Sequence, residues 1–344
     1  MISAQITTNN SSSTLGTRLI RALCCEAHLS LDQLKDKVNA SASEIIQEIE
    51  TLVGLGYPLE SHPYYGISLD NLSSAPDLLI ADEISARSIG AFASNIRVFN
   101  ELDSTNLFLM REGSHDLKHG SCVIAEKQIS GRGRLGRTWE SPAQKGLWVS
   151  FLLRPQPYGW KIEQFQRLTF IAAIALHDAI TKCTGLEVHI KWPNDIISNA
   201  HEGCKKIAGI LTETSYQTGR EPFAIVGLGC NINHSLEDFP QELQTHATSL
   251  HMLSGKHFRR ADVLVELIHA LDQRFHQPWE KILQAWNDRC AHQNKKLTVY
   301  RGPEKLSGKM IKIDNNGLLV LQDARGKVHT IASGDVSTHP QNKA

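Results

Sequence analysis

The residues best suited to chemistry stand in one short run, Gly131-Arg132-Gly133-Arg134-Leu135-Gly136-Arg137. Its glycines allow backbone angles that residues with a Cβ avoid, and they let the main chain approach a ligand closely. Its arginines add permanent positive charge and forked donors suited to phosphate or carboxylate oxygens. The run therefore predicts a loop that holds an anionic ligand.

The surroundings of this run indicate that it belongs to a folded domain. It lies between two apolar segments, 122–126 and 147–153, that have the composition of strands. Disordered Gly/Arg tails repeat for tens of residues, and this run does not. It also lacks the Gly-Lys-Ser/Thr ending of the nucleotide-triphosphatase loop and the glycine spacing of the Rossmann fold, so neither fold is implied.

Four further patches carry groups that can bind or react. They are Asp103-Ser104-Thr105-Asn106, Lys191-Trp192-Pro193-Asn194-Asp195, Lys206 at the start of an apolar strand, and Gly227-Leu228-Gly229-Cys230-Asn231. Each has an ordinary structural explanation when taken alone: a helix N-cap, a surface turn, a lysine that reaches to solvent, or a strand that needs small residues. Their joint occurrence in this order favours a single functional site.

Composition sets the class of protein. The 344 residues are 41% hydrophobic and 21% charged with a net charge of zero, as in a globular protein with no overall attraction to nucleic acid or membrane. The longest apolar stretches are too short to span a bilayer. The seven cysteines form no CxxC pair, which favours reduced thiols in a cytoplasm. The sixteen histidines show no ligand spacing, so we expect no protein-bound metal cluster.

The N-terminal part of the chain has the pattern of three helices and a hairpin. We expect a mobile tail over 1–14, a winged helix-turn-helix-like domain over 15–70 and a linker over 71–94. Ser30 with Gln33, and Ser41 with Glu44, have the spacing of capping boxes, which predicts two helix starts. Residues 59–69, interrupted by Pro63 and Gly66, predict the hairpin.

The rest of the chain predicts an α+β domain over 95–290 and a small β-barrel over 293–338. The expected strands of the larger domain are 122–126, 147–153, 186–192, 206–213 and 223–233. Turns join these strands as often as helices do, so we expect a mixed, largely antiparallel sheet. Residues 165–183 predict one long helix, and 261–288 predict helix that is interrupted near Pro278. Short alternating strands after residue 295, with a turn at Asp314-Asn315-Asn316-Gly317, indicate the barrel.

Together the five patches resemble the biotin–protein ligase family, also called biotin–acetyl-CoA-carboxylase ligase. The likeness extends to Trp139, to Ser141-Pro142 and to the full runs Lys206-Ile207-Ala208-Gly209-Ile210-Leu211-Thr212-Glu213 and Gly227-Leu228-Gly229-Cys230-Asn231-Ile232-Asn233. It runs from Leu15 to the C-terminus and matches the long bacterial ligase/repressor form. That form implies a winged helix-turn-helix domain, a class II synthetase-like mixed-sheet catalytic domain and a C-terminal SH3-like β-barrel.

The resemblance implies a reaction in two steps. Biotin and ATP, with Mg²⁺, give biotinyl-5′-AMP and pyrophosphate, and a lysine of a biotin carboxyl carrier protein domain then attacks the mixed anhydride. The charges suit this reaction, because two anionic substrates repel each other until cations neutralise them. Asp195 is the expected partner of the incoming amine, which is scarce in its neutral form below its pKa of ~10.4.

The same resemblance assigns the site residues. As catalytic residues it implies Arg134, Asp195 and Lys206. As biotin-binding residues it implies Ser104, Thr105, Asn106, Gln128, Gly131, Arg132, Gly133, Arg134, Lys206, Gly209, Gly227 and Gly229. As ATP- or adenylate-binding residues it implies Arg132, Arg134, Arg137, Trp139, Lys206 and Asn231. We expect Gly209, Gly227 and Gly229 to leave room for the ring and chain of biotin, and the arginine loop to be mobile without ligand.

The resemblance also implies a biotin-operon repressor, but the charges of the N-terminal domain argue against DNA binding. Residues 38–86 contain no Lys or Arg, and four basic and eleven acidic residues give residues 1–86 a net charge of −7. DNA affinity depends heavily on cations that meet phosphates. A retained domain that braces the ligase or mediates self-association fits better, and an exposed edge strand in the central domain could support a homodimer.

Two alternatives remain open. One is a lipoate–protein ligase of the same superfamily, and the other is a biotin-sensing transcriptional repressor without ligase turnover. The arginine loop and the Lys191-Trp192-Pro193-Asn194-Asp195 run favour biotin over lipoate. The intact Arg134, Asp195 and Lys206 favour turnover over ligand sensing alone.

Overall fold

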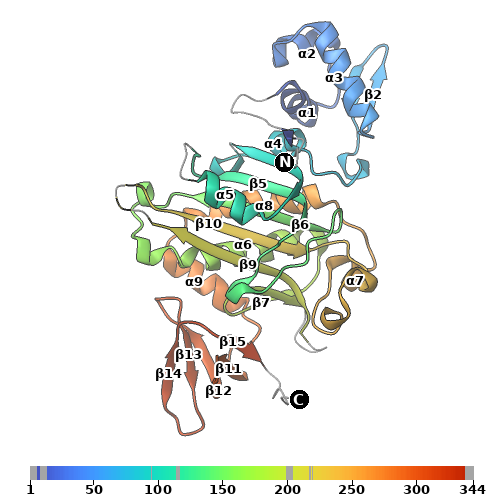
Figure 1. Cartoon of the computed structure of the whole chain (residues 1–344). Coiled ribbons are helices and arrows are strands. Elements are labelled where there is room, and N and C mark those ends of the chain that lie inside the picture. Colours follow the sequence, from blue (N-terminus) through green and yellow to red (C-terminus); the bar gives the residue numbers. More distant parts are fainter. Residues whose placement is uncertain are drawn as a thin grey trace.

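The computed structural model describes residues 6–7, 14–93, 95–113, 117–198, 204–216, 218 and 220–337. Figure 1 shows an N-terminal group of helices above a central sheet with its helices, and a separate C-terminal sheet below. Most of the expected tail over 1–14 lies outside the described residues. The backbone of β1 (Ile6–Thr7) is described, and it pairs with the edge of the central sheet.

The N-terminal unit has the three helices and the hairpin that the sequence predicts. They are α1 (Leu15–Cys25), α2 (Leu31–Val38), α3 (Ala42–Gly54), β2 (Leu59–His62) and β3 (Gly66–Leu69). Both expected capping boxes are present, with Ser30 and Gln33 at the start of α2 and Ser41 and Glu44 at the start of α3. The apolar faces of these elements share one small buried core, which includes Leu19, Leu34 and Ile45.

The segment 71–94, expected as a linker, contains helix α4 (Ala81–Arg87). One side of α4 packs through Ile84 into the core of the central domain, and the other packs through Ala86 against the N-terminal unit. The helix was not predicted because its seven residues are too few to show an apolar period. The N-terminal unit is therefore joined to the central domain by a packed helix.

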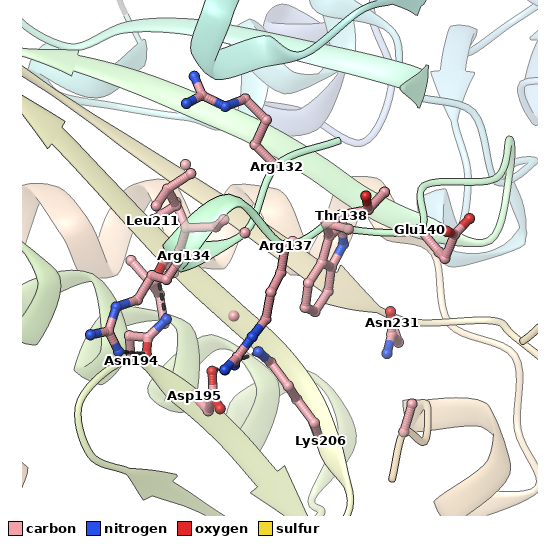
Figure 2. Close-up of a pocket in the computed structure, with 18 of the residues that line it drawn as sticks. Arg132, Arg134, Arg137, Thr138, Glu140, Asn194, Asp195, Lys206, Leu211 and Asn231 are labelled. Carbon is pink, nitrogen blue, oxygen red and sulfur yellow. Dashed lines mark hydrogen bonds and ion pairs between the residues drawn. The ribbon is translucent and has the colours of Figure 1, made fainter. Parts of the chain in front are cut away.

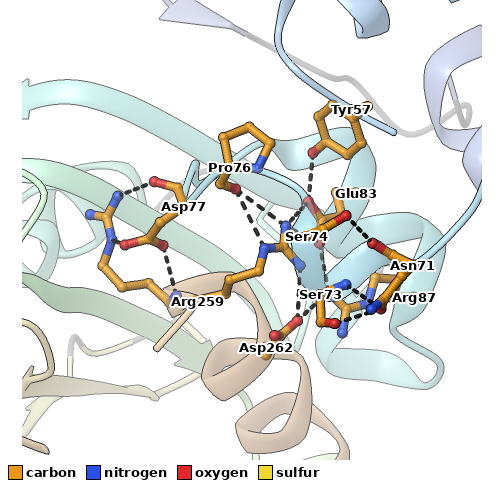
Figure 3. A network of polar contacts seen from close by, with 11 residues as sticks. Tyr57, Asn71, Ser73, Ser74, Pro76, Asp77, Glu83, Arg87, Arg259 and Asp262 are labelled. Atoms are coloured by element: carbon orange, nitrogen blue, oxygen red, sulfur yellow. Dashed lines mark hydrogen bonds and ion pairs between the residues drawn. The ribbon is translucent and has the colours of Figure 1, made fainter. Parts of the chain in front are cut away.

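A buried carboxylate on α4 fixes this junction (Figure 3). Glu83 is fully buried and accepts hydrogen bonds from Tyr57 Oη at 2.5 Å, Arg87 Nη1 at 2.5 Å and Arg259 Nη2 at 2.8 Å. Tyr57 follows α3, whereas Arg259 precedes α8 of the central domain. Because removal of one partner leaves a buried charge uncompensated, this network holds the N-terminal unit against the central domain.

The central sheet is mixed and largely antiparallel, as the sequence predicts. Its strand order is β1-β4-β5-β6-β10-β9-β8-β7, and β4 with β5 is its parallel pair among the described strands. The expected strands are present, and β1, β4 and β8 are additional strands. The bounds are β4 (Ile96–Leu102), β5 (Ser121–Gln128), β6 (Gly146–Leu153), β7 (Val188–Lys191), β8 (Asp195–Ser198), β9 (Lys206–Ser215) and β10 (Phe223–Asn231).

Helices α6 and α8 pack on each other and share the main hydrophobic core with the central sheet. The long helix and the interruption at Pro278 are confirmed, since Pro278 is the N-cap of α9. The bounds are α5 (Thr105–Glu112), α6 (Arg167–Thr184), α7 (Leu250–Ser254), α8 (Arg260–Phe275) and α9 (Trp279–Asp288). Among the described residues, no helix combines the length and the apolar character that a membrane crossing needs.

The C-terminal sheet is antiparallel with the order β14-β13-β12-β11-β15. The turn expected at Asp314–Gly317 joins two of its strands, and Gly317 has the positive φ of 79° that favours glycine. Strand β15 was not predicted. The bounds are β11 (Lys296–Arg301), β12 (Glu304–Ile313), β13 (Leu319–Gln322), β14 (Val328–Ile331) and β15 (Asp335–Ser337).

Candidate active site

A cavity of about 550 Å³ lies beside the arginine loop, above strands β9 and β10. Most of the residues predicted for the site line it, and Gly131 alone among them does not. The predicted residues on its wall are Ser104, Thr105, Asn106, Gln128, Arg132, Gly133, Arg134, Arg137, Trp139, Asp195, Lys206, Gly209, Gly227, Gly229 and Asn231. The cavity therefore brings together five patches that are far apart in the sequence.

Protein side chains occupy the space above the strand glycines. This corrects the expectation that these glycines leave room for the ring and chain of biotin. A Cβ on Gly227 would lie 2.0 Å from Asn106 Oδ1, and one on Gly229 would lie 2.5 Å from Trp139 Nε1. A Cβ on Gly209 would lie 3.1 Å from Lys206 Nζ. These glycines admit Asn106, Trp139 and Lys206 to the floor of the cavity, so the room for a ligand lies above those side chains.

The direction of β10 sets the order of groups along the cavity. Alternate residues of a strand are about 6.6 Å apart, so Gly227 and Asn231 lie roughly 13 Å apart. Asn106 lies over Gly227 and Trp139 over Gly229, while Asn231 Nδ2 donates to Thr248 O at 3.1 Å. A ligand in the cavity would therefore meet Asn106, then Trp139, then Asn231.

At the Asn106 end, amide and hydroxyl side chains form a buried hydrogen-bonding network. Thr105 N donates to Gln128 Oε1 at 2.9 Å, and Gln128 Nε2 donates to Ser141 Oγ at 2.8 Å. Ser150, which is fully buried on β6, donates its one hydroxyl proton to Asn106 Oδ1 at 2.6 Å and lies 2.7 Å from Thr105 Oγ1. The network fixes the orientation of both amide side chains, and its groups suit a neutral polar ligand.

A lysine and a carboxylate meet at the middle of the cavity (Figure 2). Lys206, the first residue of β9, places Nζ 2.7 Å from Asp195 Oδ1 and 5.0 Å from the centre of the Trp139 ring. Asp195 is the first residue of β8, directly after the predicted turn, and the preceding Trp192 is buried. The strand ends therefore deliver one ammonium group and one carboxylate to the same place.

The arginine loop is a folded turn in the structure. Gly133 N donates to Arg137 O at 2.7 Å, and Trp139 N donates to Gly131 O at 2.9 Å. Leu135 and Gly136 at its tip have φ values of 58° and 75°. These contacts give the loop a defined turn, and its expected mobility without ligand stays a prediction.

The three arginines of the loop point in two directions (Figure 2). Arg134 Nη1 donates to Asn194 Oδ1 at 2.9 Å, and Arg137 forms an ion pair with Asp335 of β15. Arg132 lies on the other side of the loop, with Nη1 3.1 Å from Glu213 Oε1. The structure therefore places Arg134 and Arg137 on the Asp195 side of the cavity and Arg132 toward the Asn106 end.

Several residues of the site carry no signal that sequence reasoning could use. Ser150 is an ordinary strand serine, and Glu213 ends the Lys206–Glu213 run without any feature that marks it. The segment after β10 and strand β15 also supply parts of the wall, namely Phe239, Leu243, His246, Ala247, Asp335 and Val336. These residues join the cavity only through the tertiary fold.

A buried histidine supports the wall beside Phe239. His234 stacks on that ring with centroids 4.8 Å apart and is 1% exposed. Burial lowers the pKa of His234 to about 4, so its ring is neutral near pH 7. In the part of the chain that the structure describes, no group of three or more His, Cys, Asp or Glu residues could hold a metal ion.

Comparisons with known proteins agree with this arrangement. The model of the Biotin/lipoate A/B protein ligase family matches residues 98–233. The chain is 29% identical over 313 residues to the bifunctional ligase/repressor BirA of Bacillus subtilis, covering 90% of this chain and 93% of that protein. It is 30% identical over 277 residues to the biotin–[acetyl-CoA-carboxylase] ligase of Mycobacterium tuberculosis, covering 74% of this chain and 94% of that protein.

A solved structure gives the same result for the fold. Biotin protein ligase from Aquifex aeolicus in complex with biotin and ATP aligns with a TM-score of 0.59 and 26% identity, covering 71% of this chain and 97% of that chain. This likeness and the match to 94% of the Mycobacterium tuberculosis ligase identify the class of protein. The chain belongs to the biotin–protein ligase family.

Proposed function

We propose that this chain joins biotin to a lysine of a biotin carboxyl carrier protein domain through biotinyl-5′-AMP. One observation carries the proposal: Lys206 and Asp195 meet between an end of the cavity that presents amide and hydroxyl groups and the Asn231 end. Biotin has the same division, because its urea ring is neutral and polar whereas its valerate ends in the carboxylate that must react.

The Asn106 end suits the urea ring. We propose that Ser104, Thr105, Asn106 and Gln128 contact this ring, with Arg132 above them and Gly131 and Gly133 shaping the loop. Thr105 and Asn106 are 4% exposed, and their partners fix which groups face the ligand. A site built to hydrogen-bond a ligand discriminates strongly against analogues that lack the bonding groups, since its buried polar atoms would stay unpaired.

The cations at the middle of the cavity suit the first step. Lys206 binds the valerate carboxylate and then the charge that develops at the acyl phosphate. Arg134 and Arg137 face the triphosphate, so the repulsion between the two anionic substrates is neutralised where they react. Pyrophosphate leaves, and the carboxylate oxygen of biotin becomes bonded to the α-phosphorus.

The far end of the cavity suits the nucleotide. We propose that Trp139 and Asn231 contact the adenylate there, beside the wall of Phe239 and Leu243. Mg²⁺ binds proteins through one or two carboxylates together with substrate phosphates. Asp195 and Asp335 are carboxylates on the cavity wall, so the described residues fit a Mg²⁺ that arrives with ATP and neutralises part of its charge.

Asp195 suits the second step. An incoming lysine amine must lose a proton as it attacks the acyl carbon and displaces AMP. Asp195 is 20% exposed at its side chain, lies on the cavity wall and can orient this amine and accept its proton. The Lys206 ammonium is already paired with the same carboxylate, so the substrate amine takes over a prepared position.

The polar end of the cavity also separates biotin from lipoate. The dithiolane ring of lipoate offers no N–H or C=O group to Thr105, Asn106 and Gln128, so their buried groups would stay unpaired. Transfer assays with labelled biotin and labelled lipoate distinguish the two. A repressor that senses biotin without turnover is excluded if ATP and biotin together release pyrophosphate.

We further propose that the N-terminal unit, residues 15–70, is a winged helix that braces the ligase rather than binding DNA. Its four cations are all engaged within the chain: Arg18 and Arg21 donate to backbone carbonyls, and Lys35 and Lys37 form ion pairs. Phosphate contacts would need such cations free. The relative's name, ligase/repressor, favours the opposite view, and a salt-dependent gel shift with biotin-operon DNA decides between them.

The remaining assignments follow the same resemblance. We propose that 71–94 joins the units, that 95–290 is the catalytic domain and that 293–338 is an SH3-like barrel. A homodimer through a sheet edge remains a prediction; β1 and β7 are the outer described strands, and sedimentation with and without biotin and ATP tests it. A cytoplasmic location is proposed because the chain has seven cysteines and no CxxC pair.

The direct test of the proposed function is transfer. The protein is incubated with biotin, ATP, Mg²⁺ and a carrier domain, and the carrier is weighed by mass spectrometry. We expect the carrier to gain one biotinyl group only when ATP is present. A carrier that keeps its mass while a known ligase modifies it would refute the proposal.

A further inference from the structure

A carboxylate outside the predicted site binds two of its members at once. Glu213 Oε1 lies 3.1 Å from Arg132 Nη1, and Glu213 Oε2 accepts from Asn106 Nδ2 at 2.8 Å. Arg132 belongs to the arginine loop and Asn106 to the first turn of α5, so one side chain of β9 ties both to the sheet. Its side chain is 21% exposed, which leaves it mostly shielded from water.

The position of Glu213 follows from the strand. Gly209 and Leu211 of β9 line the cavity, and residues two apart on a strand face the same side. Glu213 is the next residue on that side, just beyond the end of the cavity that Asn106 closes. Its carboxylate therefore stands behind Asn106 rather than in the space where a ligand would react.

Asn106 has little freedom once Glu213 is bound. Its Nδ2 donates to Glu213 at 2.8 Å and to Leu211 O at 3.3 Å, while its Oδ1 accepts from Ser150 at 2.6 Å. The missing Cβ of Gly227 leaves the space in which the amide lies. A flip of this amide would set its oxygen against the Glu213 carboxylate, and two acceptors that face each other repel.

We propose that Glu213 is a positioning residue that closes the arginine loop over the urea end of the cavity and fixes the Asn106 amide there. The proposal rests on the proposed function and deepens it, because it names what sets recognition of the urea ring. Glu213 touches neither reacting atoms nor phosphate. Glu213 acts through Arg132 and Asn106. Its loss therefore weakens biotin binding but leaves in place the groups that act in the chemical step.

The substitution Glu213→Gln tests this with little change in volume. Glutamine has one acceptor oxygen, so it can serve Asn106 or Arg132 but not both, and the ion pair is lost. We expect the KM for biotin and the rate of biotin release to rise roughly tenfold or more, since hydrogen bonds to charged groups are among the stronger ones. The KM for ATP and the kcat at saturating biotin stay within about twofold, as for an effect on binding alone.

A matched control and a second variant complete the experiment. Glu221→Gln removes a carboxylate paired with Arg154 in another part of the chain, and it leaves the KM for biotin unchanged. Arg132→Lys keeps the positive charge but loses the fork. If Glu213 acts through Arg132, both substitutions remove the same interaction. The variant that combines Glu213→Gln with Arg132→Lys should then bind biotin about as weakly as the more weakly binding single variant.

Three results would overturn the inference. They are wild-type biotin KM and release rate in Glu213→Gln, a fall in kcat with unchanged biotin KM, and full additivity in the double variant. Thermal unfolding of each variant separates loss of folding from loss of binding; should Glu213→Gln fail to fold, Arg132→Lys alone must raise the biotin KM. If the wild-type protein makes no biotinyl-AMP, the proposed function itself fails, whereas an active wild type with an equally active Glu213→Gln refutes only this inference.

Discussion

Lys206 Nζ lies 2.7 Å from Asp195 Oδ1, and the two residues begin neighbouring strands, β9 and β8. The pair joins a group suited to the first step with a group suited to the second. Before substrates bind, each neutralises the other at the middle of the cavity. A substrate carboxylate competes with Asp195 for the lysine, and a substrate amine competes with Lys206 for the aspartate.

Removal of the lysine ammonium should stop adenylate formation. We expect Lys206→Ala to lower biotin-dependent pyrophosphate exchange about 100- to 1,000-fold, as for loss of one preorganised donor at a site of developing charge. Arg134→Ala should lower it in the same direction. Lys182→Ala, which removes an exposed lysine paired with Glu266, serves as the control and should not change the rate. Wild-type exchange in Lys206→Ala or Arg134→Ala would remove that residue from the site.

Neutralising Asp195 should separate the two steps. Asp195→Asn keeps the size of the side chain but cannot accept the proton of the incoming amine, so transfer to the carrier should slow by about 10² or more. Formation of biotinyl-AMP should stay measurable. Single-turnover transfer from pre-made biotinyl-AMP isolates the second step, and an unchanged transfer rate would show that Asp195 has another role.

A methyl group on β10 should disturb the urea end. A Cβ at position 227 would lie 2.0 Å from Asn106 Oδ1, so Gly227→Ala must push this side chain off its partners. We expect the KM for biotin to rise at least tenfold, because the amide loses the bond from buried Ser150. Gly54→Ala is the control, since a Cβ there meets no atom within 4 Å. Equal biotin KM values in the two variants would contradict the proposal that biotin binds at the Asn106 end of the cavity.

Ligands should protect the arginine loop from proteolysis. The loop is held by contacts to Glu213, Asn194 and Asp335, of which the pair with Asp335 is exposed. Biotin with ATP adds anionic partners for its arginines and closes the site against water. Trypsin cleavage within 131–139 should therefore slow when both ligands are present, and cleavage at the same rate would count against loop closure.

Stability should fall as the pH is lowered from 6.5 toward 4. Burial lowers the pKa of His234 to about 4, and burial likewise lowers the pKa of His292 to about 4. The unfolded chain takes up these protons near pH 6.5, whereas the folded chain does not until about pH 4. Each histidine therefore contributes stability above pH 6.5, on the order of 3 kcal/mol, which is lost progressively through this window.

The substitution His234→Phe tests whether His234 contributes to this loss of stability at low pH. Phenylalanine keeps the stacking on Phe239 and takes up no proton, so the difference in Tm between pH 7 and pH 5 should shrink relative to the wild type. His62→Gln, at an exposed hairpin position, should leave the difference unchanged. If His234→Phe shows the same difference in Tm as the wild type, the pKa of His234 does not differ between the folded and unfolded chain.

The parts of the fold that sequence reasoning could predict carry local signals. Capping boxes mark α2 and α3, Pro278 marks the break between α8 and α9, and alternating apolar residues mark the strands. Helix α4 carries none, because its seven residues follow a Ser- and Pro-rich stretch and become helical only between two cores. Tertiary packing decides such short elements.

The same division applies to the site. The charged and glycine-rich patches are visible because their residue types are unusual where they occur. Ser150, Glu213 and Asp335 are common residues in common surroundings, and each enters the site through a partner distant in sequence. Asp335, for example, meets Arg137 across 198 positions of the chain. No spacing within one segment can report such a contact.

Adenylate formation in this cavity is measured most directly by biotin-dependent exchange of labelled pyrophosphate into ATP by the purified chain without any carrier. We expect rapid exchange with biotin, none with lipoate, and loss of exchange in Lys206→Ala. No exchange with biotin in the presence of ATP and Mg²⁺ would contradict the claim that this cavity condenses two anionic substrates into an acyl adenylate.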